Sequence, residues 1–431
     1  MNYEETLKYL YDRLPMFQRI GAAAYKADLN RTIRLVNLFG NPHEHIRFIH
    51  IAGTNGKGSV SHMLASILQS KGLKTGLYTS PHMKDFRERI RVDGKMVPRN
   101  WVTKFVSYFR KDFEPLEPSF FELTFAMAMR YFKEENVDIA VLETGMGGRL
   151  DSTNIVHPLV SVITNIGMDH KEFLGGTGEM IAAEKSGIIK PHVPVVIGKR
   201  QAVSEEIFRY KAELEEAPIW FAQDTFEVRN HDFAGVQKGK LVMDIYRNGF
   251  PFITGLRCPL TGLYQLENII TVMQVCHELI RMGYDIRKNH ITKGINDVVK
   301  QTGLLGRYQV LGRQPLIICD TGHNQEGIKM VMEQLMTEPY EKLHIVLGVV
   351  RDKELKELLR LLPGDAIYYF CKADIPRGLD AEILRQLAWS AGLRGVSYPS
   401  VRMAYEAALQ AASANDLVFI GGSTFTVAEV L

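Results

Sequence analysis

Short apolar runs alternate with amphipathic segments along the first half of the chain. The apolar runs have the length and β-branched content of buried strands, and they cover residues 48–53, 74–80, 137–145, 159–167 and 193–198. The segments with apolar residues at helical spacing are 59–72, 119–135 and 177–187. This alternation predicts a mostly parallel sheet with helices on both faces.

The pattern changes between residues 200 and 262. Segments such as 240–253 alternate apolar and polar residues, which predicts antiparallel strands attached to the first domain. Two longer amphipathic segments, 265–283 and 286–302, then predict helices. A glycine-containing break over 302–307 follows them, and we place a domain boundary there.

The strand and helix alternation restarts at about residue 306. Predicted strands cover 314–320, 343–350, 366–371 and 416–423, and predicted helices cover 325–336 and 354–362. A chain of 431 residues is also too long for one ordinary hydrophobic core. We therefore expect an α/β protein with an N-terminal P-loop-type domain over 1–302 and a smaller Rossmann-like α/β domain over 303–431.

Charge and composition narrow the choice of partners and compartment. The chain has 52 basic and 49 acidic residues, which does not favour a nucleic-acid or membrane-surface protein. Its cysteines lie far apart and predict buried, reduced thiols without zinc: Cys258, Cys276, Cys319 and Cys371. The charged amphipathic N-terminus does not resemble a signal peptide. We expect a cytoplasmic monomer that binds neither nucleic acid nor membrane.

The segment "GTNGKGS" over 53–59 is the first candidate site. It departs from the usual phosphate-loop signature, because Gly58 separates Lys57 from Ser59 and Ile51 stands where the first glycine is expected. It still joins a buried strand to a helix, where free N–H groups attract phosphate. Ser59 or Thr54 lies within reach of Mg²⁺. A tight turn with a surface lysine is the alternative, but glycines, lysine and hydroxyl together favour a phosphate site.

Polar residues follow the other predicted strands of this sheet. Glu143 ends the run 137–145, and a buried carboxylate there needs a partner such as Mg²⁺; capping of the turn after it is the alternative. His170 follows the next strand, where a satisfied loop histidine is the alternative. Lys185 lies on a predicted helix, whose lysines by default face solvent.

These motifs together resemble a known family. They are "GTNGKGS", "TSPH…FRERIRVDG", "LETGMGGRLDSTNI", "MDHKEFLG", "EKSGIIK", "LTGLYQLENI", "LGRYQV" and "DTGHN". In this order they resemble the folylpolyglutamate synthases and dihydrofolate synthases, the folate branch of the Mur ligase superfamily, from about residue 1 to 425. The resemblance implies an ADP-forming ligase that uses ATP and Mg²⁺. Its substrates would be L-glutamate and a folate or dihydropteroate, joined through an acyl phosphate.

The resemblance also implies roles for individual residues. Those implied for ATP binding are Thr54, Asn55, Gly56, Lys57, Gly58, Ser59, Asn268, Arg307 and Asp320. Those implied as Mg²⁺ ligands are Ser80, Glu143 and His170. Those implied for the folate pocket, with helix core as the alternative for the two phenylalanines, are Ser119, Phe120, Phe121, Glu122, Leu150, Asp151 and Ser152. Those implied in catalysis are Lys57, Lys185 as an N-carboxylated side chain, and His323.

Several positions depart from the family pattern. Tyr264 stands where the family usually has histidine, and "DTGHNQ" replaces "DGAHNP" through Thr321, Gly322 and Gln325. The family's "PGR" reads "LGR" here, and the C-terminal "GSLY" begins at Gly422 as "GSTF". These departures leave the ATP chemistry intact and weaken the assignment of the amino-acid site, His323 included.

Two other functions compete with a folate ligase. A cell-wall type Mur ligase would carry a separate N-terminal domain for its sugar nucleotide, and only about 45 residues precede the first predicted strand. An ATP-binding switch would not need the acceptor motifs or the set Ser80, Glu143 and His170. The motifs do not separate addition of the first glutamate to dihydropteroate from addition of later glutamates to folates, so both acceptors stay open.

Overall fold

The structure is a computed structural model that describes residues 1–16, 28–232, 239–351 and 355–431. The chain divides into two compact units. The first consists of Met1–His231, Met243–Cys258 and Gln265–Gly303, and the second of Asp232–Val242, Pro259–Tyr264 and Leu304–Leu431. No helix in the described part of the chain is long and apolar enough to cross a membrane.

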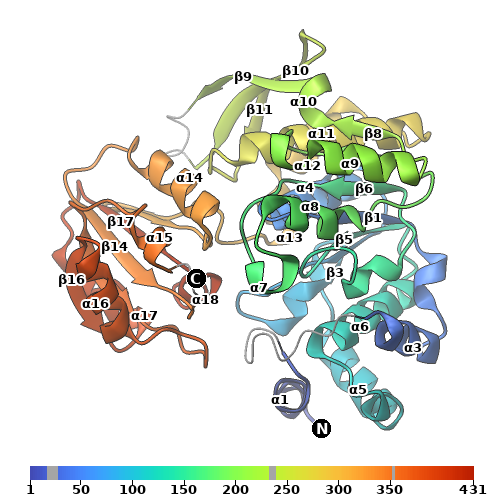
Figure 1. The fold of residues 1–431 in the computed structure, drawn as a ribbon, viewed down its shortest axis with the longest axis horizontal. Helices are drawn as coiled ribbons and strands as arrows, with labels where there is room; N and C mark the ends of the chain where they lie inside the picture. Colours follow the sequence, from blue (N-terminus) through green and yellow to red (C-terminus); the bar gives the residue numbers. More distant parts are fainter. Residues whose placement is uncertain (17–27, 233–238, 352–354) are drawn as a thin grey trace. The chain divides into compact units, whose positions relative to one another are not determined.

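An eight-stranded sheet forms the centre of the first unit, in the order β4-β3-β2-β5-β1-β6-β7-β8 (Figure 1). Its parallel strands are β2 (Thr75–Tyr78), β5 (Ile139–Glu143), β1 (Phe48–Ala52), β6 (Val160–Ile163), β7 (Val195–Ile197) and β8 (Ile219–Phe221). The short strands β3 (Ile90–Val92) and β4 (Lys95–Met96) run antiparallel at one edge. The predicted, mostly parallel sheet is confirmed.

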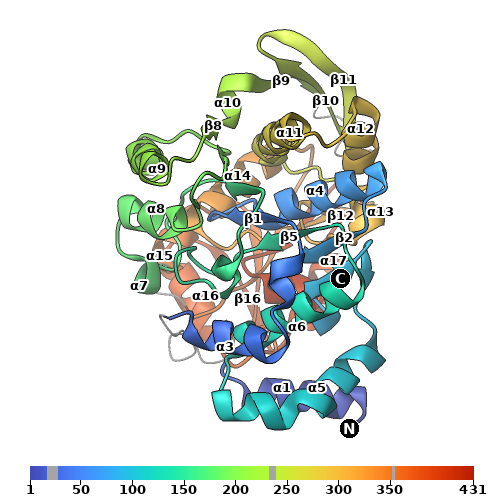
Figure 2. The ribbon, with the colours of Figure 1, turned by 90° about the vertical axis from the view of Figure 1, so that its right-hand side faces the viewer.

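One face of this sheet is covered by a helix that is itself enclosed. Helix α4 (Lys57–Lys71) packs against α11 (Gln265–Arg281), α12 (Lys288–Asn296) and α13 (Val298–Thr302) (Figure 2). The sequence suggested one apolar face, but the hydroxyl and imidazole side chains of Ser61, His62 and Ser66 are buried as well. The reason is that a second helical layer covers the side of α4 turned away from the sheet.

Gly294 allows α12 to approach α4 closely. A Cβ at this position would lie 2.5 Å from the Cα of Ile67, inside the backbone of α4. The hydroxyl of Ser66 donates a hydrogen bond of 2.6 Å to the carbonyl of Gly294 at the same contact. The helix that carries the Gly-rich loop is therefore fixed from both sides.

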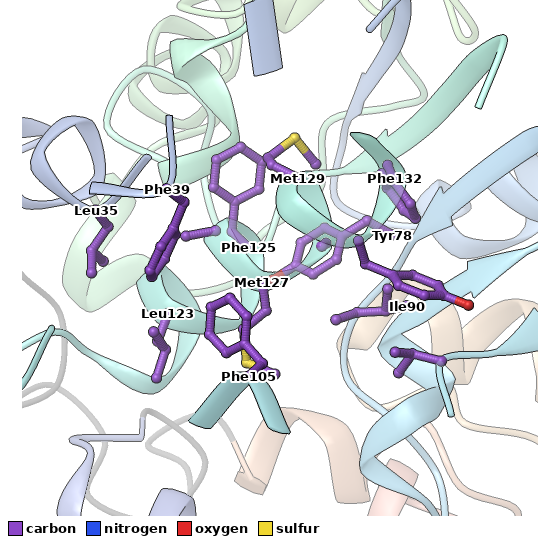
Figure 3. Packing of buried hydrophobic residues seen from close by; sticks show 14 of the residues in the cluster. Leu35, Phe39, Tyr78, Ile90, Phe105, Leu123, Phe125, Met127, Met129 and Phe132 are labelled. Atoms are coloured by element: carbon purple, nitrogen blue, oxygen red, sulfur yellow. The ribbon is translucent and has the colours of Figure 1, made fainter. Parts of the chain in front are cut away.

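The opposite face of the sheet carries an extensive apolar cluster. Its centre is α6 (Phe120–Glu134), which matches the predicted helix over 119–135, and Figure 3 shows Phe125, Met127 and Phe132 of α6 in this cluster. Around it pack α1 (Tyr3–Arg13), α3 (Asn30–Leu38), α5 (Arg99–Phe113), η2 (Pro42–His45) and η4 (Glu114–Leu116). These surrounding elements were not predicted from the sequence.

The prediction of antiparallel strands from residue 200 was wrong in its starting point. Residues Ala202–Leu214 form the helix α9, in which Phe208 and Ala212 are buried at helical spacing. The antiparallel sheet begins only at residue 226 and consists of β9 (Phe226–Asp232), β10 (Leu241–Arg247) and β11 (Phe250–Cys258). Asn248 and Gly249 have φ values of 50° and 80°, the backbone of a tight hairpin turn between β10 and β11.

The second unit contains a six-stranded sheet in the order β12-β13-β17-β14-β15-β16. Its strands are β12 (Gln309–Arg313), β13 (Leu316–Cys319), β17 (Leu417–Gly421), β14 (Leu343–Gly348), β15 (Ile367–Cys371) and β16 (Arg394–Tyr398), and only β12 is antiparallel. Its longer helices are α14 (Gln325–Leu335), α16 (Ala381–Ser390) and α17 (Val401–Ala411). The smaller α/β unit is confirmed, whereas α16, β16 and α17 were not predicted.

The remaining helices are short, apart from α8. They are η3 (Phe86–Arg89), η5 (Ser152–Ile155), α7 (Lys171–Leu174), α8 (Gly178–Ser186), α10 (Ala222–Thr225), α15 (Leu355–Leu359) and α18 (Thr424–Ala428). All four cysteines are free and buried, as expected from their spacing. Burial raises the pKa of Cys276 to about 12, so this thiol stays protonated at neutral pH.

We expect the substitution Gly294→Ala to destabilise the first unit by about 1–3 kcal/mol, because the new methyl group meets the backbone of α4. The free energy of unfolding, measured by urea denaturation, checks this. Gly176→Ala is the matched control, since a Cβ there has no heavy atom within 4 Å. Equal stability of the two variants would contradict the close approach of α12 to α4.

Candidate functional site

Two glycines shape the loop between β1 and α4. Gly53 has a φ of +145°, and a Cβ there would lie 1.8 Å from the hydroxyl oxygen of Thr164. Gly56 has a φ of +86°, and a Cβ there would lie 2.2 Å from Oδ1 of Asn268. Both positions combine an unfavourable backbone angle with a direct clash, so the loop in this form requires glycine at each.

The loop is fastened to the segment that follows β6. Asn165 accepts from the N–H of Thr54 through its carbonyl (3.0 Å) and from the N–H of Asn55 through Oδ1 (2.9 Å). The hydroxyl of Thr54 donates to the carbonyl of Gly167 (3.1 Å) and accepts from its N–H (2.9 Å). Thr54 had been a candidate ATP and Mg²⁺ contact, but its hydroxyl is engaged within the protein. The support that residues 164–167 provide for the loop was not predicted from the sequence.

Helix α4 begins at Lys57 directly after this loop. Gly56 is its N-terminal cap, and no side chain caps the helix. The N–H groups of the first turn therefore keep their partial positive charge for an outside acceptor. Ser59, in this first turn, is only 1% exposed.

An amide pair at the start of α11 holds this arrangement. The side chain of Gln265 is fully buried and donates to the hydroxyl of Ser59 at 3.1 Å. Asn268 in turn donates to Oε1 of Gln265 at 2.8 Å. Asn268 therefore lies against Gly56, where ATP binding was expected, while Gln265 is a supporting residue that the sequence reasoning missed although it stands in "YQLENI".

Two lysines converge on one carbonyl oxygen. Lys57 Nζ and Lys185 Nζ each donate a hydrogen bond of 2.9 Å to the carbonyl of Gly53. Lys185 comes from α8 and is 3% exposed, so the expectation of a solvent-facing helical lysine was wrong. Burial, followed by repulsion from Lys57, lowers the pKa of Lys185 to about 7. Near neutral pH a large fraction of this amine is uncharged.

Glu143 and Ser80 lie together at the end of neighbouring strands. Glu143 is the last residue of β5 and pairs with Ile51 of β1, which places it at the level of the loop. It is 5% exposed and accepts a hydrogen bond of 3.1 Å from the N–H of Ser80. His170 precedes α7, has a φ of 52°, and its side chain is 34% exposed with Nδ1 3.8 Å from an oxygen of Asp169.

A buried relay fixes the loop after Glu143. Asp151 accepts from the N–H groups of Gly145 (2.8 Å) and Met146 (2.9 Å), and from the hydroxyl of Thr153 (2.5 Å). Since Thr153 donates to Asp151, it accepts from Nε2–H of His50 at 2.7 Å. Burial, followed by repulsion from Lys190, lowers the pKa of His50 to about 3, so this histidine stays neutral. The carboxylate of Asp151, expected to contact a folate, thus also holds its own loop.

The other residues expected at the folate pocket divide into two groups. Ser119 and Glu122 form a capping box at the start of α6, and Glu122 also pairs with Arg31 at 3.3 Å, so both serve the fold. Phe120 is 2% exposed and belongs to the core.

In the second group Phe121 and Leu150 keep some exposure, whereas Ser152 is buried. The ring of Phe121 is half-buried, 5.8 Å from that of Tyr78, and comes within 2.6 Å of a Cβ placed on Gly145. Leu150 is also half-buried, and Ser152, at the start of η5, is 8% exposed. Of the two phenylalanines, Phe121 is the one left to meet a ligand.

The remaining candidates lie in the second unit. Asp320 is 3% exposed and accepts from the hydroxyl of Tyr264 (2.5 Å) and the N–H groups of Tyr308 (2.7 Å) and Gly322 (2.6 Å). Burial raises the pKa of Asp320, and these hydrogen bonds oppose the shift. Tyr264, which departs from the family pattern, is therefore the direct partner of Asp320.

Arg307 and His323 meet at Thr321 in the same unit. Arg307 donates to the hydroxyl of Thr321, and Nδ1 of His323 lies 3.0 Å from its carbonyl oxygen. Gln325 follows Asn324, which caps α14, and is the first residue of that helix. The departure at Thr321 thus supplies a hydroxyl that orients Arg307.

Comparison with known families covers most of the chain. Residues 51–276 match the Mur ligase middle domain. Residues 306–424 match the Mur ligase glutamate ligase domain. The first match includes the Gly-rich loop, both lysines and Glu143, and the second includes Arg307 and Asp320.

Two curated relatives resemble the chain over nearly all its length. A dihydrofolate synthase/folylpolyglutamate synthase of Bacillus subtilis is 31% identical, and the match covers 90% of each chain. A probable bifunctional folylpolyglutamate synthase/dihydropteroate synthase of Haloferax volcanii is 33% identical over 100% of this chain and 50% of that protein. The chain thus spans about half the length of the first curated relatives it matches.

Solved structures of high similarity contain ligands. Escherichia coli FolC in complex with DHPP and ADP has a TM-score of 0.87 and 27% identity, covering 100% of this chain and 97% of that one. A bifunctional folylpolyglutamate synthase/dihydrofolate synthase with Mn, AMPPNP and L-glutamate bound has a TM-score of 0.83 and 26% identity, with the same coverage.

We expect Thr153→Val to lower the free energy of unfolding by about 1–3 kcal/mol, because it leaves Nε2–H of His50 and an oxygen of Asp151 without their buried partner. Urea denaturation at neutral pH measures the effect. Thr103→Val, at an exposed helix position, is the control of the same shape. A loss no larger than that of the control would show that the relay contributes nothing to stability.

Proposed function

The chain belongs to the Mur ligase family, in its folylpolyglutamate synthase and dihydrofolate synthase branch, and from this membership we propose that it is an ATP-dependent ligase that joins L-glutamate to a folate or to dihydropteroate. The observation that carries the proposal is the uncapped start of α4 beneath the Gly-rich loop, with Lys57 beside it. Backbone N–H groups, helix dipole and ammonium together suit the phosphates of ATP.

The chemistry follows from the poor reactivity of a carboxylate. Its oxygen attacks the γ-phosphorus of ATP, ADP leaves, and the resulting acyl phosphate has a good leaving group. The amine of L-glutamate then attacks the acyl carbon and phosphate departs. The protein's contribution is to neutralise phosphate charge and to align the reactants. Lys57 supplies the charge, and we propose Asn55, Gly56, Gly58 and Asn268 as further ATP contacts.

The donor set beside the loop fits Mg²⁺. Among the described residues no three His, Cys, Asp or Glu side chains gather in one group, and Mg²⁺ characteristically takes few protein carboxylates together with phosphates and waters. We propose Glu143, Ser80 and His170 as its ligands; Glu143 is buried and already adjacent to Ser80. When bound, the ion supplies positive charge to the phosphates.

Lys185 has the surroundings of a lysine that reacts with CO₂. Carboxylation needs a neutral amine, and the burial of Lys185 beside Lys57 supports this state. The N-carboxylated side chain would carry a negative charge next to Lys57 and would offer oxygen to a second Mg²⁺.

We assign the acceptor to the first unit and glutamate handling to the second. Phe121 and Leu150 keep some exposure beside the loop that Asp151 holds, which supports a flat heterocycle there, with the buried Ser152 next to them. The match of 306–424 to a glutamate ligase domain supports the amino-acid role of residues 303–431, with Arg307, Asp320 and His323 as its candidates. We also propose that the protein is a cytoplasmic monomer. Its four free thiols support the cytoplasmic location.

The test of this function is substrate-dependent turnover of ATP. We expect ADP release to require both L-glutamate and a pteroyl acceptor, and the product, sized by mass spectrometry, to carry added glutamate. ATP hydrolysis at full rate without an acceptor would instead favour an ATP-binding switch. Dihydropteroate and tetrahydrofolate assayed separately show which acceptor the enzyme uses.

Lys57→Ala identifies the phosphate site in the same assay. We expect turnover to fall by about 100-fold or more, because the variant loses a full charge at the phosphates. Circular dichroism should show an intact fold, since Lys57 donates to the carbonyls of Gly53 and Thr54 in its own loop. Turnover near that of the original enzyme would place the phosphate site elsewhere.

Carboxylation of Lys185 should rise with pH through about 7. The pKa of Lys185 is lowered to about 7, so the reactive neutral amine gains population as pH increases through that value, whereas an ordinary lysine stays protonated. ¹³C NMR of protein equilibrated with ¹³CO₂ measures the carbamate, and Lys185→Ala gives the background. A spectrum identical to that of Lys185→Ala at pH 8 would argue against carboxylation.

A further inference from the structure

A buried arginine lies among neutral partners in the first unit. Arg89, the last residue of η3, is 3% exposed. Its Nε donates a hydrogen bond of 2.8 Å to Nδ1 of His82, and its guanidinium carbon lies 5.1 Å from the ring centroid of Phe120. Within the described part of the chain, Arg89 forms no ion pair with a carboxylate.

His82 cannot offset the charge of Arg89. Because Nδ1 of His82 accepts from Arg89, its Nε2 carries the proton and faces the hydroxyl of Tyr11 at 3.5 Å. The ring is therefore a neutral hydrogen-bond partner that orients the guanidinium.

The outer edge of the guanidinium has no acceptor among the described residues. Arginine has five N–H donors, and four of them belong to the two terminal nitrogens. Neither terminal nitrogen of Arg89 is fully enclosed by the protein, so both retain access from outside. A cation removed from water without an anion is costly, and the planar fork of two terminal nitrogens matches a carboxylate. The guanidinium of Arg89 is therefore suited to bind an anion that enters from outside the protein.

Arg89 lies beside residues expected at the acceptor. Its guanidinium stacks on Phe120, whose neighbour Phe121 packs against Tyr78. The carboxylates of Glu143 and Glu88 interact with its charge at longer range, without an ion pair. A fixed cation on the carboxylate that reacts would stabilise the starting state, since that carboxylate loses its negative charge on phosphorylation. A carboxylate that keeps its charge throughout the reaction is the better ligand.

Resting on the proposed function, we propose that Arg89 binds the non-reacting carboxylate of a folate acceptor and thereby favours folates over dihydropteroate. The glutamyl group of a folate has two carboxylates, and only one of them is extended. Dihydropteroate has a single carboxylate, which is the one that reacts. Arg89 is thus a specificity-determining residue. A comparison of the two acceptors distinguishes its role from that of the rest of the pocket, because only folate has a carboxylate for it to bind.

The test measures steady-state constants of Arg89→Met with both acceptors. We expect the KM for tetrahydrofolate to rise by about 10-fold to 100-fold, the cost of a lost charge-assisted pair, with the KM for dihydropteroate and for ATP unchanged. Arg87→Met is the matched control. Arg87 lies in the same short helix, is paired with Asp85 at 2.7 Å and is more exposed, so its removal should change none of these constants.

The other outcomes overturn the proposal in different ways. An equal rise of KM for both acceptors would make Arg89 part of the pocket common to them, and no change would remove it from the site. Should Arg89→Met fail to fold by circular dichroism, Arg89→Lys and Arg89→Gln decide the matter by the same contrast between acceptors. If the unsubstituted enzyme turns over dihydropteroate but not tetrahydrofolate, the proposed role of Arg89 is wrong and the proposed function stands. If it uses neither acceptor, the proposed function is wrong.

Discussion

The carbonyl oxygen of Gly53 receives hydrogen bonds from two lysine side chains, and the site is organised around this point. Lys57 arrives from the first turn of α4 and Lys185 from α8, so two helices and the end of β1 meet at one atom. Burial, followed by repulsion from Lys57, lowers the pKa of Lys185. The positive charge at this point favours an anion beside it, either a phosphate group or the carboxylated side chain of Lys185.

Buried polar contacts hold the loops around this point in place. Thr164 and Asn165 fasten the Gly-rich loop to β6, and Gln265 fixes Ser59 from α11. The relay from His50 through Thr153 reaches Asp151, which holds the turn after Glu143. These donors and acceptors are buried or partly buried and are paired with each other, so a change of loop shape would leave polar groups unsatisfied. The site is therefore preorganised by residues that need not touch a substrate.

Adjacent residues in the chain serve different units. Tyr264 belongs to the second unit and donates to Asp320, whereas Gln265 begins α11 of the first unit and donates to Ser59. Tyr264 and Thr321 depart from the family pattern, but both have defined partners, since Thr321 accepts from Arg307. The substitutions therefore alter which groups orient Asp320 and Arg307 and leave both side chains in hydrogen-bonded positions.

The sequence determined the parts of this protein that depend on local pattern. Buried strands such as β1 and β5, the helix α6 and the Gly-rich turn follow from apolar periodicity and glycine spacing. Lys57 was evident from its place in the Gly-rich segment, and Glu143 from its place at the end of a buried strand. The tertiary structure decided which polar side chains are engaged. It buried Lys185, turned the hydroxyl of Thr54 to Gly167, and made a capping box of Ser119 and Glu122. It also left Arg89 with no ion pair to a carboxylate of the residues that the structure describes. Partners such as His50 and Thr153 are 103 residues apart in the sequence, and a pattern along the chain does not register contacts of that range.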